Sequence, residues 1–326
     1  MELDHRPKYH FQPLANWMND PNGLIQWKGT YHLFYQHNPH EAVHGQIHWG
    51  HAMSEDLVHW VHLPIALAPD PWGPDKDGCY SGCAVNDCGT PTLVYTGVHP
   101  QVQCLATSED GLISWQKDPG NPIIATPPEG LSLVGFRDPY VWCEDGEWLM
   151  ALGAGREGRA GMVLLYRSSD LRQWEYLHPL CEANSLHEGV MWECPNFVSV
   201  EGRHVLFVSA LPLRRVLYFV GEYAERRFSL GRANVLDYGG HFYAPQVLVD
   251  EQGRRLLWGW IWEGRSQAAQ RAAGWAGVMS LPRELSWDEQ GRLCILPVRE
   301  LQALRRGHWR LGEIAFNEGS YPLEVQ

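Results

Sequence analysis

The sequence has few long apolar runs and few basic residues. No uninterrupted apolar run approaches the about 20 residues that a membrane-spanning helix requires. The N-terminus, Met-Glu-Leu-Asp-His-Arg, lacks the apolar segment of a secretory signal. The 26 Lys and Arg residues stand against 38 Asp and Glu, which gives a formal net charge of −12 and disfavours nucleic acid or an anionic membrane surface as a partner. We therefore expect a cytoplasmic protein that binds neither.

Helical periodicity is almost absent from the chain. Only residues 299–306, which stop before Gly307, and the alanine-rich residues 266–273 have the composition of a helix. Short apolar or alternating runs separated by Gly, Pro, Asn and Asp recur instead, at residues 23–35, 92–95, 148–152, 162–166, 204–209, 217–221 and 256–261. This pattern predicts an all-β protein of antiparallel strands and hairpins. The 16 Trp residues suit either a β-rich core or platforms for sugar rings.

Cysteine and histidine form neither a disulfide pattern nor a metal-binding pattern. The eight cysteines lie in a long chain without a visible secretory signal, so we expect reduced core residues. Cys79, Cys83 and Cys88 contain no C-x-x-C pair, and the histidines between residues 37 and 51 fit no zinc-ligand spacing. We therefore expect no metal site and no cofactor.

One turn sequence occurs three times. Ser-x-Asp followed by Leu and Trp begins at residues 54, 108 and 168, and this spacing is about one blade of a β-propeller. In each copy we expect the Asp to accept hydrogen bonds from nearby backbone N–H groups and the Trp to pin the hairpin. Residues 1–298 are therefore predicted to form one domain, a five-bladed β-propeller.

Three acidic residues lie in unusual polar stretches. Asp20 belongs to residues 16–23 (Asn-Trp-Met-Asn-Asp-Pro-Asn-Gly), where proline and glycine predict a rigid corner before a strand. Asp138 follows Arg137 and precedes a proline, and Glu193 stands between a tryptophan and Cys-Pro. Inner strands of successive blades would bring the three acids to one central funnel. Repulsion and burial there would raise at least one pKa, and a carboxyl pair about 5–5.5 Å apart suits glycoside hydrolysis with retention.

Here the chain resembles a known family. Residues 19–23 (Asn-Asp-Pro-Asn-Gly), 136–139 (Phe-Arg-Asp-Pro) and 193–195 (Glu-Cys-Pro) resemble, in that order, the three signatures of glycoside hydrolase family 32. That family contains the invertases, other β-fructofuranosidases, inulinases and levanases. The likeness continues in residues 35–39, 48–52, 80–82, 242–246 and 274–285, and it therefore covers nearly all of residues 5–300.

The resemblance implies a five-bladed propeller that hydrolyses terminal β-D-fructofuranosides with retention. By motif position, Asp20 would be the nucleophile and Glu193 the acid/base. Asp138 would hold fructose hydroxyls and stabilise the transition state, and Arg137 would orient the ring and the acids. Other positions match residues that line the fructose pocket, namely Asn19, Gln36, Trp49 and Ser81, with Tyr80 and Trp260 as further pocket aromatics.

The expected partner is a small-molecule sugar, either sucrose or a short fructoside. Several alternatives remain open at this point: sucrose 6-phosphate, the ends of inulin or levan, fructosyl transfer, or a propeller that binds fructosides without cleaving them. A phosphate would require a cation at the rim of the pocket, for which Arg265 and Arg271 are the candidates. The oligomeric state is not set by the sequence.

The chain departs from the family pattern in three places. Asn196 stands where an acid often follows Cys-Pro, and we expect it to affect the acid/base. His241 stands where an acid usually precedes Phe-Tyr-Ala, and we expect altered hydroxyl contacts. Residues 299–326 are expected to be a linker helix followed by opening strands, at residues 309–316 and 323–326, of a C-terminal β-sandwich that is otherwise absent or truncated.

Overall fold

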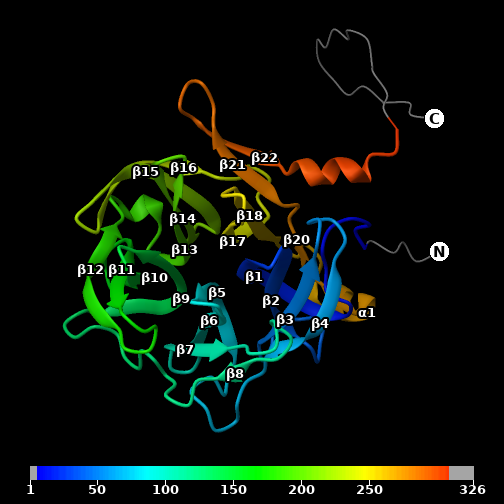
Figure 1. Ribbon diagram of the computed structural model, residues 1–326, viewed down its shortest axis with the longest axis horizontal. Helices are drawn as coiled ribbons and strands as arrows, with labels where there is room; N and C mark the ends of the chain where they lie inside the picture. Colours follow the sequence, from blue (N-terminus) through cyan, green and yellow to red (C-terminus); the bar gives the residue numbers. More distant parts are fainter. Residues whose placement is uncertain (1–5, 308–326) are drawn as a thin grey trace.

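The computed structural model describes residues 6–307 and shows a ring of five β-sheets around a central axis (Figure 1). The all-β class and the five-bladed propeller predicted from the sequence are confirmed. Within the described residues, no helix has the length and apolar character needed to cross a membrane. The expected strands at residues 309–316 and 323–326 lie outside the described residues.

Each blade is an antiparallel sheet whose strands follow one another from the axis outwards. Blade 1 contains β1 (Asn16–Trp27), β2 (Thr30–Asn38), β3 (His48–Ser54) and β4 (Val61–Leu67). Blade 2 contains β5 (Cys79–Asp87), β6 (Thr90–Gly97), β7 (Val102–Thr107) and β8 (Gln116–Lys117). Blade 3 contains β9 (Leu133–Glu144), β10 (Glu147–Arg156), β11 (Gly161–Ser168) and β12 (Glu175–Glu182).

The last two blades are built in the same way. A short 3-10 helix, η1 (Leu186–Glu188), leads into blade 4, which contains β13 (Met191–Val200), β14 (Arg203–Leu211), β15 (Arg215–Ala224) and β16 (Arg227–Val235). Blade 5 contains β17 (Phe242–Val249), β18 (Arg255–Ile261), β21 (Arg283–Trp287) and β22 (Leu293–Pro297). A second 3-10 helix, η2 (Arg299–Leu304), follows, so the helix predicted at residues 299–306 is present but shorter.

The hydrophobic core is divided among the contacts between neighbouring blades. Five clusters of buried side chains each join two adjacent blades; the one between blades 1 and 5, for example, includes Leu33, Tyr35 and Trp258. Such a core exists only when each blade has both neighbours, so the ring itself is required for burial of these side chains.

The repeated Ser-x-Asp turns connect the third and fourth strands of blades 1, 2 and 3. In the first turn, Asp56 Oδ1 accepts hydrogen bonds from the backbone N–H groups of residues 58 and 59 at 2.9 and 2.8 Å. Asp110 and Asp170 accept equivalent bonds from their own turns. The indole N–H of Trp60 and of Trp174 donates to the turn backbone, which confirms the predicted pinning at two of the three turns.

One local prediction was wrong. Residues 16–23 form no corner: they belong to β1, which continues from Asn16 to Trp27. The apolar run at residues 23–35 forms a hairpin, as it divides into the antiparallel strands β1 and β2 at a turn where Lys28 and Gly29 both have positive φ. The predicted helix at residues 266–273 is confirmed as α1 (Gln267–Ala273), capped by the Ser266 side chain.

Proline and polar residues on the inner strands cause bulges rather than corners. Every inner strand is out of register with its neighbour at one or two points. In each there is a shift at which the inner strand has an extra residue, at residues 18–21, 80–82, 137–140, 193–196 and 243–246. Asp138, Cys194 and Ala244 have φ values of 65°, 47° and 46° at these points. A bulge re-aims side chains locally, and here the re-aimed residues surround the axis.

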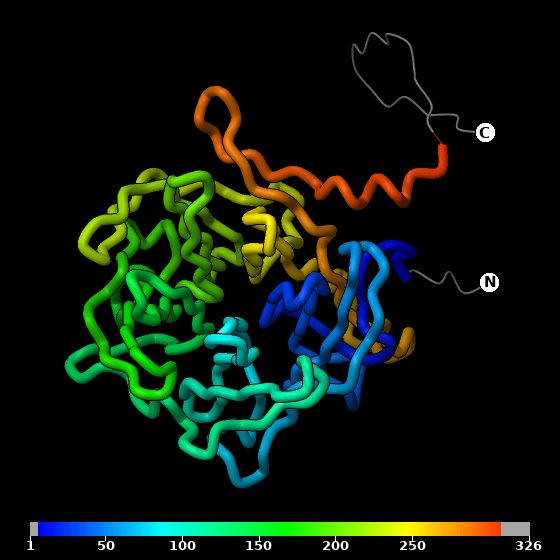
Figure 2. The backbone as a smooth tube through the Cα atoms, in the orientation of Figure 1, coloured from blue at the N-terminus to red at the C-terminus, as the bar shows by residue number. Residues whose placement is uncertain are grey.

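A short segment after α1 closes the ring. β19 (Trp275–Ala276) pairs in parallel with β1, and two residues later β20 (Val278–Met279) pairs with β18 of blade 5. Figure 2 shows the blue start of the chain beside this orange-yellow segment. Gly277 lies between the two pairings with φ 81°, and a Cβ there would approach Met18 O to 2.1 Å. The segment therefore joins the first and last blades directly.

Candidate active site

The three predicted acids meet around the axis. Asp20 lies on β1, Asp138 on β9 and Glu193 on β13. The Cys194 thiol lies 3.8 Å from Asp20 Oδ2 and 3.5 Å from Asp138 Oδ2. The Arg137 guanidinium lies 2.7 Å from Glu193 Oε1 and 3.9 Å from Asp138 Oδ2. The structure thus brings together three carboxyl groups that are far apart in the sequence.

Asp20 is held by two polar side chains from neighbouring strands. Ser81 Oγ donates to Asp20 Oδ2 at 2.6 Å, and Gln36 Nε2 lies 3.4 Å from the same oxygen. Burial and repulsion from the other two acids raise the pKa of Asp20 to about 8, although the Ser81 hydrogen bond acts in the opposite direction. The carboxyl group is therefore fixed in position, and its ionised form is disfavoured by these surroundings.

Asp138 is the most deeply buried of the three acids, with 5% of its surface exposed. Its Oδ2 accepts a hydrogen bond from the Cys194 backbone N–H at 3.0 Å, and its own N–H donates to Thr96 Oγ1 at 3.0 Å. Burial and repulsion from Glu193 raise the pKa of Asp138 to about 6, against the opposing effect of Arg137. The side chain and the backbone of Asp138 are both locked by other blades.

Glu193 is held at both carboxylate oxygens. Arg137 donates to Oε1 through Nη2 and Nε at 2.7 and 3.2 Å, and the Tyr243 hydroxyl donates to Oε2 at 2.7 Å. Burial raises the pKa of Tyr243, so the hydroxyl remains a donor. Tyr243 was not among the predicted site residues. Its position before Ala-Pro, like that of Glu193 before Cys-Pro, was the available signal.

The predicted pocket residues divide into two groups. Ser81 and Gln36 contact Asp20, and Asn19 has a buried side-chain oxygen without a hydrogen-bond partner among the described residues. Trp49 differs from the prediction: it is fully buried, and its indole N–H donates to Tyr80 O at 3.0 Å. Trp49 therefore supports the Tyr80 backbone from behind and has no surface with which to contact a sugar.

Below the acids the channel is closed. Residues from all five inner strands line a cavity of only about 10 Å³, which is room for about one water molecule. Gln246 crosses this region: its amide oxygen accepts from Leu24 N at 2.8 Å and its amide nitrogen donates to Gly82 O at 2.7 Å. This part of the axis is therefore too narrow for anything larger than about one water molecule.

Stacked rings lead from the acids to the rim at blade 5. Trp260, predicted as a pocket aromatic, packs edge-on against Trp17 and stacks on Trp262 with ring centroids 5.5 Å apart. Trp262 also packs edge-on against Tyr243 at 5.2 Å, and the Arg214 guanidinium lies 4.6 Å from the Trp262 centroid. Trp262 thus packs directly against Tyr243, whose hydroxyl donates to Glu193.

The two sequence departures lie outside the contacts of the acids. The Asn196 amide donates to the backbone oxygens of residues 194 and 245 at 3.0 and 2.9 Å, and its oxygen accepts from Val247 N at 2.9 Å. Asn196 therefore ties blade 4 to blade 5. His241 is exposed, and its ring nitrogen lies 3.3 Å from Trp262 O, so its role is to hold the rim backbone.

No metal cluster occurs in the described part of the chain: residues 6–307 contain no group of three His, Cys, Asp or Glu side chains placed to hold an ion. His32 and His51 form a buried pair at 3.0 Å inside blade 1, where burial lowers the pKa of both. All eight cysteines are free.

Comparison with known proteins agrees with this geometry. Residues 10–297 match the model of the glycosyl hydrolases family 32 N-terminal domain. The chain belongs to glycosyl hydrolase family 32. Among family 32 relatives, a raffinose invertase of Escherichia coli is 44% identical, over 92% of this chain and 66% of that protein. A sucrose-6-phosphate hydrolase of Escherichia coli is 43% identical, over 98% of this chain and 71% of that protein.

The fold of this family 32 chain is also found among solved structures. A β-fructofuranosidase of Bombyx mori, solved as a mutant in complex with sucrose, superimposes with a TM-score of 0.83 at 35% identity, over 93% of this chain and 68% of that one. The chain spans about two thirds of the length of these relatives.

Proposed function

We propose that the protein hydrolyses terminal β-D-fructofuranosyl residues, from sucrose or short fructosides, with retention of configuration. The observation that supports this proposal is the gathering of the three acids from the inner strands of three blades: Arg137 contacts both Glu193 and Asp138, and the Cys194 thiol lies within 3.8 Å of both Asp20 and Asp138. The relatives named above, an invertase and a sucrose-phosphate hydrolase, support the same class of substrate.

In the first half of the reaction, Asp20 attacks the anomeric carbon of fructose while Glu193 gives its proton to the leaving oxygen. The bond to the leaving sugar breaks as the bond to the Asp20 carboxylate forms. Water then attacks the fructosyl ester, Glu193 takes its proton, and the Asp20 carboxylate is released. Positive charge on the sugar ring grows in both transition states, so the anionic Asp138 nearby stabilises them more than the neutral substrate.

The charges of the site limit how protons are shared. Three carboxyl groups and one guanidinium would carry an uncompensated charge of about −2 if all were ionised, which buried groups disfavour. The raised pKa values of Asp20 and Asp138 are a consequence of this cost of ionising all three acids. The reaction needs the proton on Glu193 and an ionised Asp20. The Ser81 hydrogen bond favours the ionised form of Asp20.

Substitution of the two acids tests the proposal. Asp20→Asn and Glu193→Gln nearly preserve side-chain size and each keep one acceptor oxygen, so the fold should remain while sucrose turnover falls by at least about 10³-fold, because covalent and acid catalysis are removed. Released glucose and fructose are measured together with circular dichroism. Wild-type protein that binds sucrose but releases no fructose would instead support a propeller that binds fructosides without cleaving them.

Sucrose 6-phosphate is a second candidate substrate. The sequence candidates Arg265 and Arg271 are paired with Glu263 and Glu41, at 2.5 and 3.3 Å. Arg214, held over Trp262 at the rim, has no ion pair among the described residues. An unpaired guanidinium suits a phosphate on the leaving sugar.

The test of this second candidate compares two substrates. If Arg214 binds the phosphate, Arg214→Gln should raise KM for sucrose 6-phosphate about tenfold or more and leave the KM for sucrose within about twofold. Equal effects on both substrates would contradict phosphate recognition by Arg214, without affecting the assignment of the acids.

A further inference from the structure

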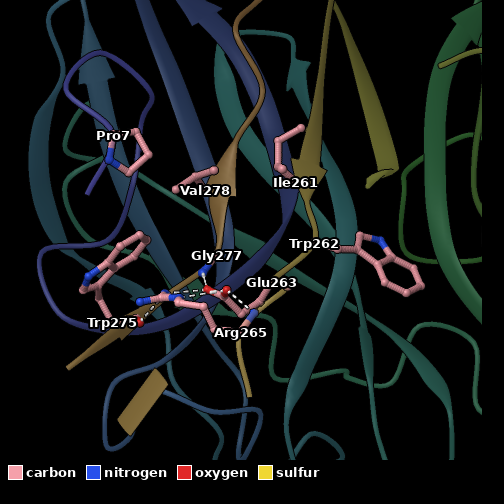
Figure 3. Close-up of a pocket in the computed structure, with 9 residues that line it drawn as sticks. Pro7, Ile261, Trp262, Glu263, Arg265, Trp275, Gly277 and Val278 are labelled. Atoms are coloured by element: carbon pink, nitrogen blue, oxygen red, sulfur yellow. Dashed lines mark hydrogen bonds and ion pairs between the residues drawn. The ribbon is translucent and has the colours of Figure 1, made fainter. Parts of the chain in front are cut away.

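A second cavity lies beside the catalytic funnel at the junction of blades 5 and 1. It has a volume of about 400 Å³, within the range of about 300–1,000 Å³ typical of small-molecule sites. It lies between the rim loop after β18 and the ring-closing segment, with the N-terminal Pro7 at one side (Figure 3). None of its lining residues contributes to the contacts of the three acids.

The lining combines apolar walls with one pair of opposite charges. In Figure 3, Pro7, Val278 and Ile261 lie on the side opposite Glu263 and Arg265. The Glu263 carboxylate accepts hydrogen bonds from Arg265 Nη2 and Nε at 2.5 and 2.9 Å. A sugar ring packs its C–H face on an apolar surface and binds polar groups through its hydroxyls, and this lining offers both.

The charge of the cavity selects against an anionic ligand. Glu263 and Arg265 neutralise one another, so no net positive charge remains to bind a phosphate or carboxylate. Glu263 would also repel an anion at this distance. Each Glu263 oxygen already accepts two hydrogen bonds: Oε1 from Arg265 N and Nε, and Oε2 from Arg265 Nη2 and Gly277 N. Arg265 Nη1 has no hydrogen-bond partner within the described residues, so it is the donor that the pair offers to a ligand. The cavity therefore suits a neutral ligand with hydroxyl groups.

One wall of the cavity contacts the side chain that holds the proposed acid/base, Glu193. Trp262 is a wall of the cavity, and its ring packs at 5.2 Å against Tyr243, whose hydroxyl donates to Glu193. Trp262 also has a buried indole N–H without a partner among the described residues. Since Glu193 is proposed to protonate the leaving oxygen, these contacts connect the cavity with the leaving-group side of the site.

We propose that this cavity, walled by Trp262, Val278 and the Glu263–Arg265 pair, binds a second neutral sugar unit of the leaving group. It thereby favours trisaccharide fructosides over sucrose. This inference rests on the proposed function, because it takes the side next to Glu193 as the leaving side. The second unit is either the galactose attached to glucose, as in raffinose, or the glucose attached to the internal fructose, as in 1-kestose.

The test fills the cavity and compares substrates. Val278→Trp places an indole in the cavity, and Val278→Phe is a smaller change in case the first variant does not fold. The matched control is Val249→Trp, at the C-terminal end of β17, because this valine is 48% exposed and does not line the cavity. The kcat/KM of each protein is measured for sucrose, raffinose and 1-kestose, and the ratio of each trisaccharide to sucrose is compared with that of the wild type.

We expect the filled variants to lower the ratio about tenfold or more for at least one trisaccharide, and the control to leave both ratios unchanged. A loss for raffinose alone identifies galactose attached to glucose as the occupant, and a loss for 1-kestose alone identifies glucose attached to the internal fructose. Ratios within about twofold of the wild type for both trisaccharides would overturn the proposal.

A binding measurement separates this proposal from the catalytic one. Melibiose, the disaccharide that raffinose would release, should raise the Tm of the wild type more than glucose does, and Val278→Trp should remove the difference. If the wild type cleaves no sucrose but shows this difference, the cavity proposal stands and the catalytic proposal fails. If sucrose is cleaved and neither the ratios nor the melibiose shift respond to Val278, the cavity proposal alone fails.

Discussion

Asp20 is the residue at which burial and the proposed function conflict most directly. The proposed nucleophile must be ionised, yet burial and the neighbouring acids raise the pKa of Asp20 to about 8. The Ser81 hydrogen bond offsets part of this effect, and Gln36 Nε2 lies 3.4 Å from the same carboxylate oxygen. The proposed reactivity therefore depends on a neutral side chain that takes no part in the proton transfer itself.

The pH dependence of activity should reveal the role of Ser81. Its hydrogen bond lowers the pKa of Asp20, so Ser81→Ala should raise that pKa further, and ionised Asp20 should appear only at higher pH. A hydrogen bond to a charged group contributes about 1.5–3 kcal/mol, which corresponds to about 1–2 pH units. We expect the acid limb of the kcat/KM profile for sucrose to move upwards by about that amount.

Ser81→Thr is the control for this experiment, because it keeps a hydroxyl at the same position. Its acid limb should lie closer to that of the wild type than the limb of Ser81→Ala. An acid limb that moves to lower pH in Ser81→Ala would mean that Ser81 does not stabilise the ionised carboxylate.

At the level of residues, the sequence predicts the acids better than their partners. Asp20, Asp138 and Glu193 stand in motifs whose order and content are specific, so their convergence could be anticipated. The motif at residues 242–246 indicated that Tyr243 lies near the site, but not that its hydroxyl donates to Glu193. That contact and the burial of Trp49 both depend on how one blade packs against the next. A motif indicates that a residue lies near the site without indicating whether its side chain reaches the surface.

At the level of elements, the inner strands explain why one prediction failed. Proline and glycine in residues 16–23 indicated a corner, but hydrogen bonding to β2 continues on both sides of Pro21. The strand accommodates the proline by a bulge, since an inner strand already lacks a sheet neighbour on the axial side over most of its length. Proline and glycine at these positions are thus compatible with a bulged strand as well as with a turn. Only the pairing with β2 determines that residues 16–23 form a strand.

The Ser-x-Asp turns should contribute measurably to stability. Asp56→Ala removes the acceptor of two backbone N–H groups and of the Ser54 hydroxyl. By analogy with the loss of a capping side chain, the free energy of unfolding should fall by about 1 kcal/mol. Urea denaturation measures this change.

Glu55→Ala is the matched control, because the adjacent Glu55 is exposed and makes no hydrogen bond through its side chain within the described residues. Its effect should remain below about 0.5 kcal/mol. Equal losses in the two variants would indicate that the turn does not depend on the aspartate.

At the level of the whole molecule, the ring depends on a short segment between α1 and β21. The sequence indicated a family-like motif at residues 274–285 but not its role, because β19 and β20 are two residues long and pair with blades at opposite ends of the chain. Contacts between residues so far apart in the sequence leave no periodic signal in either partner.

Two glycines of this segment allow a direct test of ring closure. Gly274 and Gly277 both have positive φ, but only at Gly277 would an added Cβ meet another atom, Met18 O, at 2.1 Å. Gly274→Ala should therefore cost about 1 kcal/mol of backbone strain. Gly277→Ala should cost at least about 2 kcal/mol more, because the strand of blade 1 must also move.

Thermal unfolding of the two variants measures the difference, and sucrose hydrolysis reports whether Asp20 is displaced as well. Similar Tm values for Gly274→Ala and Gly277→Ala would show that the approach of β19 to β1 is not needed for a stable ring.

The closing segment also sets an order of events during synthesis. The strand that carries Asp20 leaves the ribosome early, whereas its parallel neighbour, Trp275–Ala276, follows some 250 residues later. Until then the first blade has one flank without its partner. A nascent chain that has already produced all three acids is therefore still an unfinished catalyst, and the last blade to emerge completes the pocket whose first wall was made at the beginning.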